Sequence, residues 1–311
     1  MRFDKPFKEA DLKRSEGVSV TSHMIADAGF EGVRALVAFG KFYLNPLLQG
    51  LISKTEREET ILGLHYRMMN YLLSLLKLNA PIYFQSIVAT ARSLYELGLD
   101  MAIFSQNVVN APDERIWAFN FVERYRAAER IVNFYESRQL PPDLKNINQQ
   151  RQFCSDLNNK KKKDEIILKY WGKKTGYPLH WSGIGKIQDR AKRAGGNWED
   201  RYCYYYSMFS WYVHSGLTGV AGIPQEKFDA IAAVAYHLIK DVVLDSYKIL
   251  GHELLLPKAM PEWDERMKFL DLTDGLALVD KQLQSLGEPM RFFYLEEHEV
   301  DHIIEKTDAS K

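Results

Sequence analysis

Residues 197–216 read N-W-E-D-R-Y-C-Y-Y-Y-S-M-F-S-W-Y-V-H-S-G, and this stretch predicts an aromatic helix. Glu199 and Asp200 suit its first turn, and Gly216 suits the position just after its end. Residues four apart lie above one another on a helix, so one face carries a stripe of four polar or aromatic side chains: Tyr202, Tyr206, Ser210 and His214. The flanking positions are largely aromatic or apolar, so the stripe needs partners inside the fold.

His214 lies near the predicted C-terminus of this helix, where backbone carbonyls favour the imidazolium form. Two interpretations follow. In one, His214 is a core histidine that a backbone carbonyl satisfies. In the other, it is a functional side chain.

Composition indicates a globular protein with a packed core. The chain has 311 residues, of which 46% are hydrophobic, and its 41 basic and 41 acidic residues give no net charge. Nothing global therefore directs it to nucleic acid or to anionic membranes. Two cysteines are too few for a disulfide framework, so we expect a cytoplasmic location, with no signal peptide and no membrane span.

Apolar residues recur at helical spacing along most of the chain, which predicts an all-α multi-helix bundle. Helices are expected from Thr21 to Asn45, from Thr55 to Leu78 with a Thr55–Glu58 capping box, and after Pro81. Further helices are expected over 114–137 and 225–255. Prolines at 257 and 261 suggest a core domain of residues 1–256 and a C-terminal helical appendage of residues 257–311.

Arg92 and Glu96 lie one turn apart inside an otherwise apolar helix. Charged groups there need partners, and an arginine that precedes a glutamate is the less favourable order for an intrahelical pair. We therefore expect the partner on another helix, within reach of the Ser210–His214 turn. A structural ion-pair network and a catalytic or ligand-binding cluster both remain open.

The motifs R-S-L-Y-E at 92–96, H-W-S-G at 180–183 and Y-x-x-x-S-x-x-x-H-S at 206–215 resemble a bacterial family catalogued as a domain of unknown function, over about Leu75 to Ser246. The resemblance implies an all-helical fold that gathers Arg92, Glu96, Ser210 and His214 as the candidate catalytic residues. Tyr206 and Trp181, from the same motifs, are the candidate ligand-binding residues. No metal and no cofactor is predicted.

A looser similarity is to HEPN-type helical ribonucleases, which place an arginine and a histidine on one helix and usually dimerise. Arg291 and His298 match the spacing, which arises by chance in a chain with this many arginines. His214 has no arginine at that distance, so Arg92 would supply the charge from a neighbouring helix. The similarity implies RNA as partner, a homodimer, and a toxin or defence role.

The remaining motifs are weaker evidence of function. The string H-E-V-D-H at 298–302 spells a zinc helix, but no third ligand follows and its neighbours are acidic, as on a solvated helix. Ser210 with His214 lacks the strained turn and oxyanion donors that acyl transfer needs. Gly183 and Gly185 lack the strand and the third glycine of a phosphate loop. The run Lys160–Lys163 is interpreted as a solvated face, with phosphate contact as the alternative.

Two functions remain. The first is a metal-independent ribonuclease in which His214 is the general acid or base, Arg92 binds the scissile phosphate and Glu96 orients Arg92. The second is a non-catalytic helical binding protein whose Arg92, Glu96, Ser210 and His214 form a structural network.

Overall fold

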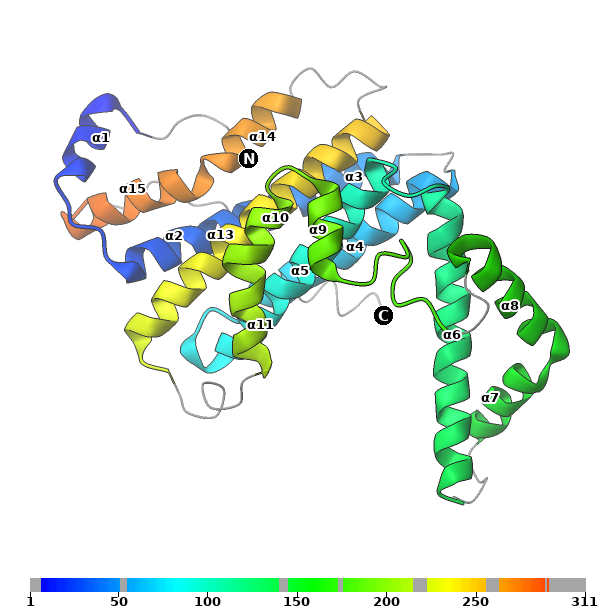
Figure 1. Ribbon diagram of the computed structural model, residues 1–311. Coiled ribbons are helices and arrows are strands. Elements are labelled where there is room, and N and C mark those ends of the chain that lie inside the picture. The colour runs from blue at the N-terminus through cyan, green and yellow to red at the C-terminus, as the bar shows by residue number, and fades with distance from the viewer. Residues whose placement is uncertain are drawn as a thin grey trace. The chain divides into compact units, whose positions relative to one another are not determined.

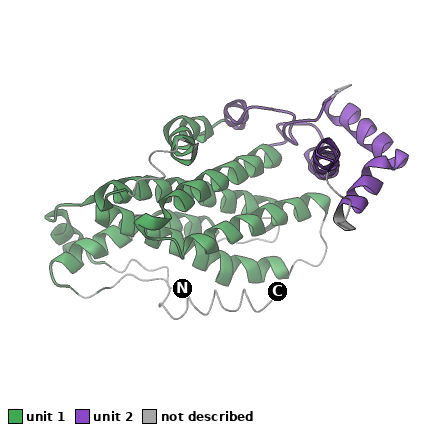
Figure 2. Ribbon diagram, turned by 90° about the horizontal axis from the view of Figure 1, so that it is seen from below, with its two compact units in different colours: residues 1–105, 195–311 green, residues 106–194 purple. Residues whose placement is uncertain are grey.

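The computed structural model confirms the all-α fold (Figure 1). It describes residues 7–50, 55–139, 145–172, 176–214, 223–255, 263–288 and 290, and these residues contain helices and no strand. The described chain divides into two compact units, coloured separately in Figure 2: unit 1 contains residues 1–105 and 195–311, and unit 2 contains residues 106–194. The predicted boundary near residue 256 stays a prediction, and the compact units follow a different division.

Unit 1 is built around the long helix α13 (Gln225–Leu250), which packs on α2 (Ser22–Phe39) and α5 (Phe84–Ser105), as Figure 1 shows. Helix α4 (Glu56–Leu75) packs on α5. The other elements are short: α1 (Glu9–Glu16), η1 (Gly40–Leu44), α3 (Asn45–Gln49), η2 (Pro81–Tyr83), α10 (Trp198–Arg201), η3 (Tyr202–Tyr206), α11 (Ser207–His214), η4 (Gly251–Leu255), α14 (Trp263–Asp271) and α15 (Thr273–Ser285).

The predicted helix starts are confirmed by their capping bonds. At the start of α4 the Thr55 backbone N–H donates to the Glu58 carboxylate at 2.7 Å, and the Glu58 N–H donates to the Thr55 hydroxyl at 3.2 Å. This reciprocal capping box pairs backbone donors that a helix N-terminus otherwise leaves unbonded. Thr21 caps α2 by accepting from the Met24 N–H.

Helices α5 and α13 approach closely at Gly98. A Cβ atom at this position would lie 2.4 Å from Cγ1 of Val242 and 3.0 Å from the Trp198 ring. Real Cβ atoms do not come so close, so only glycine lets the two backbones approach to this distance. Tyr95, one turn before Gly98, donates its hydroxyl to the Trp198 carbonyl at 2.7 Å, which fixes the start of α10 against α5.

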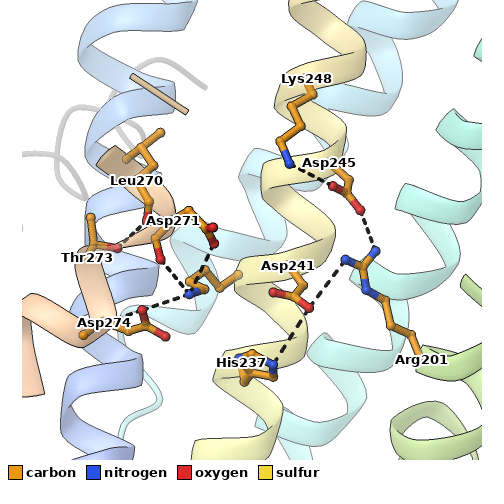
Figure 3. Close-up of polar contacts among 11 residues, drawn as sticks. Arg201, His237, Asp241, Asp245, Lys248, Leu270, Asp271, Thr273 and Asp274 are labelled. Carbon is orange, nitrogen blue, oxygen red and sulfur yellow. Dashed lines mark hydrogen bonds and ion pairs between the residues drawn. The ribbon is translucent and has the colours of Figure 1, made fainter. Parts of the chain in front are cut away.

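Buried charges tie the shorter helices to α13 (Figure 3). Arg201, with a side chain only 7% exposed, binds Asp245 at 2.6 Å and Asp241 at 3.4 Å. On another face of α13, the buried Lys240 ammonium binds Asp274 at 2.8 Å and donates to the Asp271 carbonyl. Each buried cation thus has carboxylate or carbonyl partners, as a low-dielectric site requires.

Unit 2 consists of α6 (Pro112–Ser137), α7 (Lys145–Ser155), α8 (Leu157–Trp171) and α9 (Ile187–Ala194). Pro112 occupies the first turn of α6, where its missing N–H costs nothing. Helices α7 and α8 pack on α6 around a small apolar core that includes Val122, Tyr125 and Ile147. The loop between α8 and α9 contains the H-W-S-G motif.

Candidate functional site

Arg92, Glu96 and Tyr206 form one hydrogen-bonded cluster between α5 and η3. The Arg92 Nε–H donates to the Tyr206 hydroxyl at 2.9 Å, and that hydroxyl donates to Glu96 Oε1 at 2.7 Å. The direct Arg92–Glu96 contact is longer, at 3.3 Å. Tyr206, one turn before Ser210, is therefore a partner of this pair on another helix. The predicted reach to the Ser210–His214 turn stays a prediction.

Packing holds Tyr206 in this position. Its ring lies 5.2 Å from the Tyr95 ring and stacks on Tyr202 at 5.5 Å, and the Arg92 guanidinium lies over it at 5.0 Å. Burial, together with the hydrogen bond to Glu96, raises the pKa of Tyr206 to about 12. The hydroxyl therefore keeps its proton and links arginine to carboxylate as acceptor and donor at once.

A π-helical turn explains why Tyr206 faces the pair. Residues 202–206 bond at i→i+5, and the Ser207 N–H donates to the Tyr202 carbonyl. The wider turn interrupts the predicted regular stripe, since it adds a residue between α10 and α11. Such turns cluster at functional sites, but here the observed consequence is a local one: Tyr206 is directed at α5.

Ser210 and His214 lie farther along α11. Helices α5 and α11 run antiparallel, since Tyr95 contacts Tyr206 while Phe84 meets the Tyr212 ring edge-on at 5.2 Å. His214 is the last residue of α11, eight residues after Tyr206, which corresponds to about 12 Å along a helix. The His214 side chain lies outside the described residues, and Ser210 is half-buried.

Trp181 belongs to unit 2, whereas the Arg92 cluster belongs to unit 1. Its side chain is 5% exposed, and its carbonyl accepts the Trp171 indole N–H at 3.1 Å. Its predicted role in ligand binding stays a prediction.

Sequence reasoning missed a second polar cluster, formed by His180, Ser182 and the buried Arg190 of unit 2. Arg190 Nη1 lies 2.7 Å from His180 Nε2, and His180 Nδ1 lies 2.8 Å from the Ser182 hydroxyl oxygen. The Ser182 backbone N–H also donates to His180 Nδ1 at 3.2 Å, so His180 is held from both ring nitrogens. The Ser182 hydroxyl oxygen also accepts the Ile184 N–H, so the cluster fixes the H-W-S-G loop. The H-x-S spacing was the only signal in the sequence.

Residues 58–225 match a family described as "Family of unknown function (DUF5677)". The match covers more than half of the 311-residue chain. The chain belongs to this family. The DUF5677 region runs from α4 to the first residue of α13, so it contains the Arg92 cluster and all of unit 2. The predicted resemblance to a family of unknown function is thereby confirmed. No curated protein and no solved structure matches the chain.

Among the described residues, no group of three or more His, Cys, Asp and Glu side chains is placed to hold a metal ion. None of the described helices has both the length and the apolar content of a membrane span. The H-E-V-D-H string at 298–302 and the Arg291–His298 pair lie outside the described residues.

Proposed function

We propose that this DUF5677 protein binds single-stranded RNA through unit 2. The observation that carries the proposal is a segregation of charge. Residues 106–194 contain 18 Lys and Arg against 10 Asp and Glu, a net charge of +8, so the rest of this neutral chain has a net charge of −8. Lysine and arginine neutralise phosphates, and such charge asymmetry is typical of nucleic-acid-binding proteins.

Aromatic and basic side chains share one face of α6, which supports RNA in particular. Trp117, 49% exposed, Phe121 and Arg124 follow at i, i+4 and i+7. Lys162 of α8 lies 4.8 Å over the Phe121 ring, and Arg124 lies 4.7 Å over Phe153. Exposed rings flanked by cations bind unstacked bases and their phosphates, the combination found in proteins that bind single strands.

The lysine run on α8 supplies charge next to this face. Lys160, Lys161 and Lys162 are exposed, whereas Lys163 is held by Asp164 at 3.0 Å. The Lys161 ammonium lies 3.8 Å from the Glu165 carboxylate, a long contact between two exposed side chains. Exposed ammonium groups are available for phosphate.

The Arg92 cluster supports a binding rather than a catalytic protein. Glu96 Oε1 and the Tyr206 hydroxyl both accept from the Arg92 Nε–H, and the guanidinium lies over the Tyr206 ring. The same three side chains join α5 to η3 by hydrogen bonds. A network of this kind stabilises the packing of the two elements.

The test is binding of a short fluorescein-labelled oligouridylate, followed by anisotropy. Changing Lys160, Lys161 and Lys162 to glutamine should weaken binding by about tenfold or more, because counterion release at these sites is lost. The matched control changes three exposed lysines of unit 1, Lys13, Lys227 and Lys248, to glutamine and removes the same charge. Equal losses in both variants, or no binding by wild type, would contradict the proposal, as would tighter binding of a duplex DNA of equal length.

Metal-independent RNA cleavage is the second candidate. It is favoured by one observation: the Arg92 side chain is 26% exposed and belongs to the helix that packs on α11, which ends at His214. In this mechanism Arg92 stabilises the phosphate charge and His214 transfers the proton. Wild type and His214→Ala, matched in thermal stability, are incubated with total RNA and a chelator. Cleavage by wild type alone supports the mechanism, and intact RNA with both excludes it.

A further inference from the structure

A polar pocket of about 460 Å³ lies within unit 2, apart from the α6 face described above. Its walls come from the start of α6 at Arg115, the end of α8 at Tyr170 and Trp171, the loop that includes Gly183, and Arg193 of α9. The volume falls in the range of roughly 300–1,000 Å³ that small-molecule sites occupy.

The pocket is positively charged. Arg115 and Arg193 line it, and no carboxylate is found among the described residues of its lining. The nearest carboxylate in sequence, Glu114, is bound by the Lys169 ammonium and the Tyr170 hydroxyl, so it does not neutralise the pocket. Two guanidinium groups without an acidic counterpart favour an anionic ligand.

Arg115 has unused donor capacity. Its Nη1 donates to the Ser182 carbonyl at 3.3 Å, but its Nε is buried and has no hydrogen-bond partner among the described residues. Burial also lowers the pKa of this guanidinium, although arginine remains charged. An unbonded buried donor on a cation is costly, and a nearby negative charge would offset part of that cost.

Gly183 lets the loop backbone lie close to the side chains of Trp171 and Arg115. Its φ is +78°, a left-handed conformation that favours glycine, and an added Cβ would lie 3.1 Å from the Trp171 ring and 3.6 Å from Arg115 Nη1. The glycine thus keeps the space beside both side chains open.

Trp171 offers an aromatic wall in a fixed orientation. Its indole N–H donates to the Trp181 carbonyl at 3.1 Å, and its ring contacts Phe119 and Tyr170 at centroid distances of 6.2 and 5.8 Å. A ring held in this way needs little further ordering to stack on a planar base.

From a fixed aromatic wall beside two cations, we infer that this pocket binds a nucleoside monophosphate. Arg115 and Arg193 take the phosphate, and the base lies against Trp171. This inference does not rest on RNA binding by the α6 face and the lysine run, since a free mononucleotide is the ligand.

The test is isothermal titration calorimetry of the full chain with AMP, GMP, CMP and UMP, each compared with its nucleoside and with inorganic phosphate. At least one nucleotide should bind, and its nucleoside and phosphate alone should each bind at least about tenfold more weakly, because each makes only part of the contacts. Arg115→Gln and Trp171→Leu should each weaken that nucleotide by about tenfold. Arg130→Gln, an exposed arginine on the same helix, is the charge-matched control and should bind as wild type does.

Arg193 is exposed, so Arg193→Gln keeps the inference testable if the Arg115 variant loses its fold by circular dichroism. Three results overturn the inference: no binding of any of the four nucleotides, phosphate binding as tight as that of the nucleotide, or unchanged affinity in the folded arginine variants. Because the lysine-run variants test RNA binding separately, failure of one proposal is distinguishable from failure of the other.

Discussion

At the scale of single residues, the Tyr206 hydroxyl is the atom that holds the Arg92–Glu96 pair together. Tyr206→Phe removes both of its hydrogen bonds while keeping the ring, so we expect a loss of about 1 kcal/mol in the free energy of unfolding. Denaturant unfolding measures this loss. Tyr204→Phe, at a ring 71% exposed, is the control and should change nothing. Equal stability of wild type and Tyr206→Phe would show that the bonds contribute no net stability.

His65 makes stability depend on pH. It is 1% exposed, contacts the Asn45 side-chain oxygen at 3.2 Å, and burial lowers its pKa to about 4. In the unfolded chain the pKa is about 6.5, so below that pH the unfolded state binds the proton and the folded state does not. Stability contributed by the neutral ring is present above pH 6.5 and is lost as pH falls toward 4.

The expected loss is about 2 kcal/mol between pH 7 and pH 5, from a shift of this size. Urea unfolding of wild type and His65→Gln across this range measures it. The variant should lose less stability than wild type on acidification. Parallel curves for the two proteins would refute the assignment to His65.

The need for a partner at Arg92 and Glu96 was predictable from the sequence, because two charges in an apolar helix require one. The identity of that partner was harder to predict, because a regular helix places both Tyr206 and Ser210 on the same face and favours neither as the partner. The π-helical turn at 202–206 ends at Tyr206, whose hydroxyl bonds Arg92 and Glu96 of α5, and a regular helical pattern in the sequence does not reveal such a turn.

At the scale of helices, the α5–α13 crossing depends on Gly98. Gly98→Ala should destabilise the protein by about 1–3 kcal/mol, because the added methyl group overlaps Val242 and Trp198. Gly63→Ala on α4 is the matched control: an added Cβ there meets nothing within 4 Å, so better helix propensity should stabilise the protein by about 0.5–1 kcal/mol. Thermal unfolding compares the two variants. Stabilisation by both would mean that the crossing can widen without cost.

Helix ends were the most predictable elements. Thr55 and Thr21 act through local geometry, so the helix starts that they predict are found in the fold. The segments that pair across the bundle were less predictable. The contacts of Arg201 with Asp241 and Asp245 join residues about 40 positions apart, and no local pattern specifies them.

At the scale of the whole molecule, the net charge of zero is the sum of a basic unit 2 and an acidic remainder of the chain. Zero net charge gives the whole chain no attraction to nucleic acid, whereas residues 106–194 alone have a net charge of +8. The division into two units depends on contacts between residues far apart in the sequence, and these contacts cannot be inferred from the composition.

This segregation predicts a strong dependence of RNA affinity on salt despite zero net charge. For single strands, the logarithm of the association constant falls with the logarithm of salt concentration by about 0.7 for each phosphate neutralised. Replacing Lys160, Lys161 and Lys162 by glutamine should therefore reduce the slope by about 2, whereas the control at Lys13, Lys227 and Lys248 should leave it unchanged. Anisotropy titrations over a range of KCl concentrations measure the slopes. A wild-type slope near zero would mean that the basic unit does not neutralise RNA phosphates. Each phosphate that a lysine neutralises releases a counterion, and each released counterion adds to the salt dependence of the association constant.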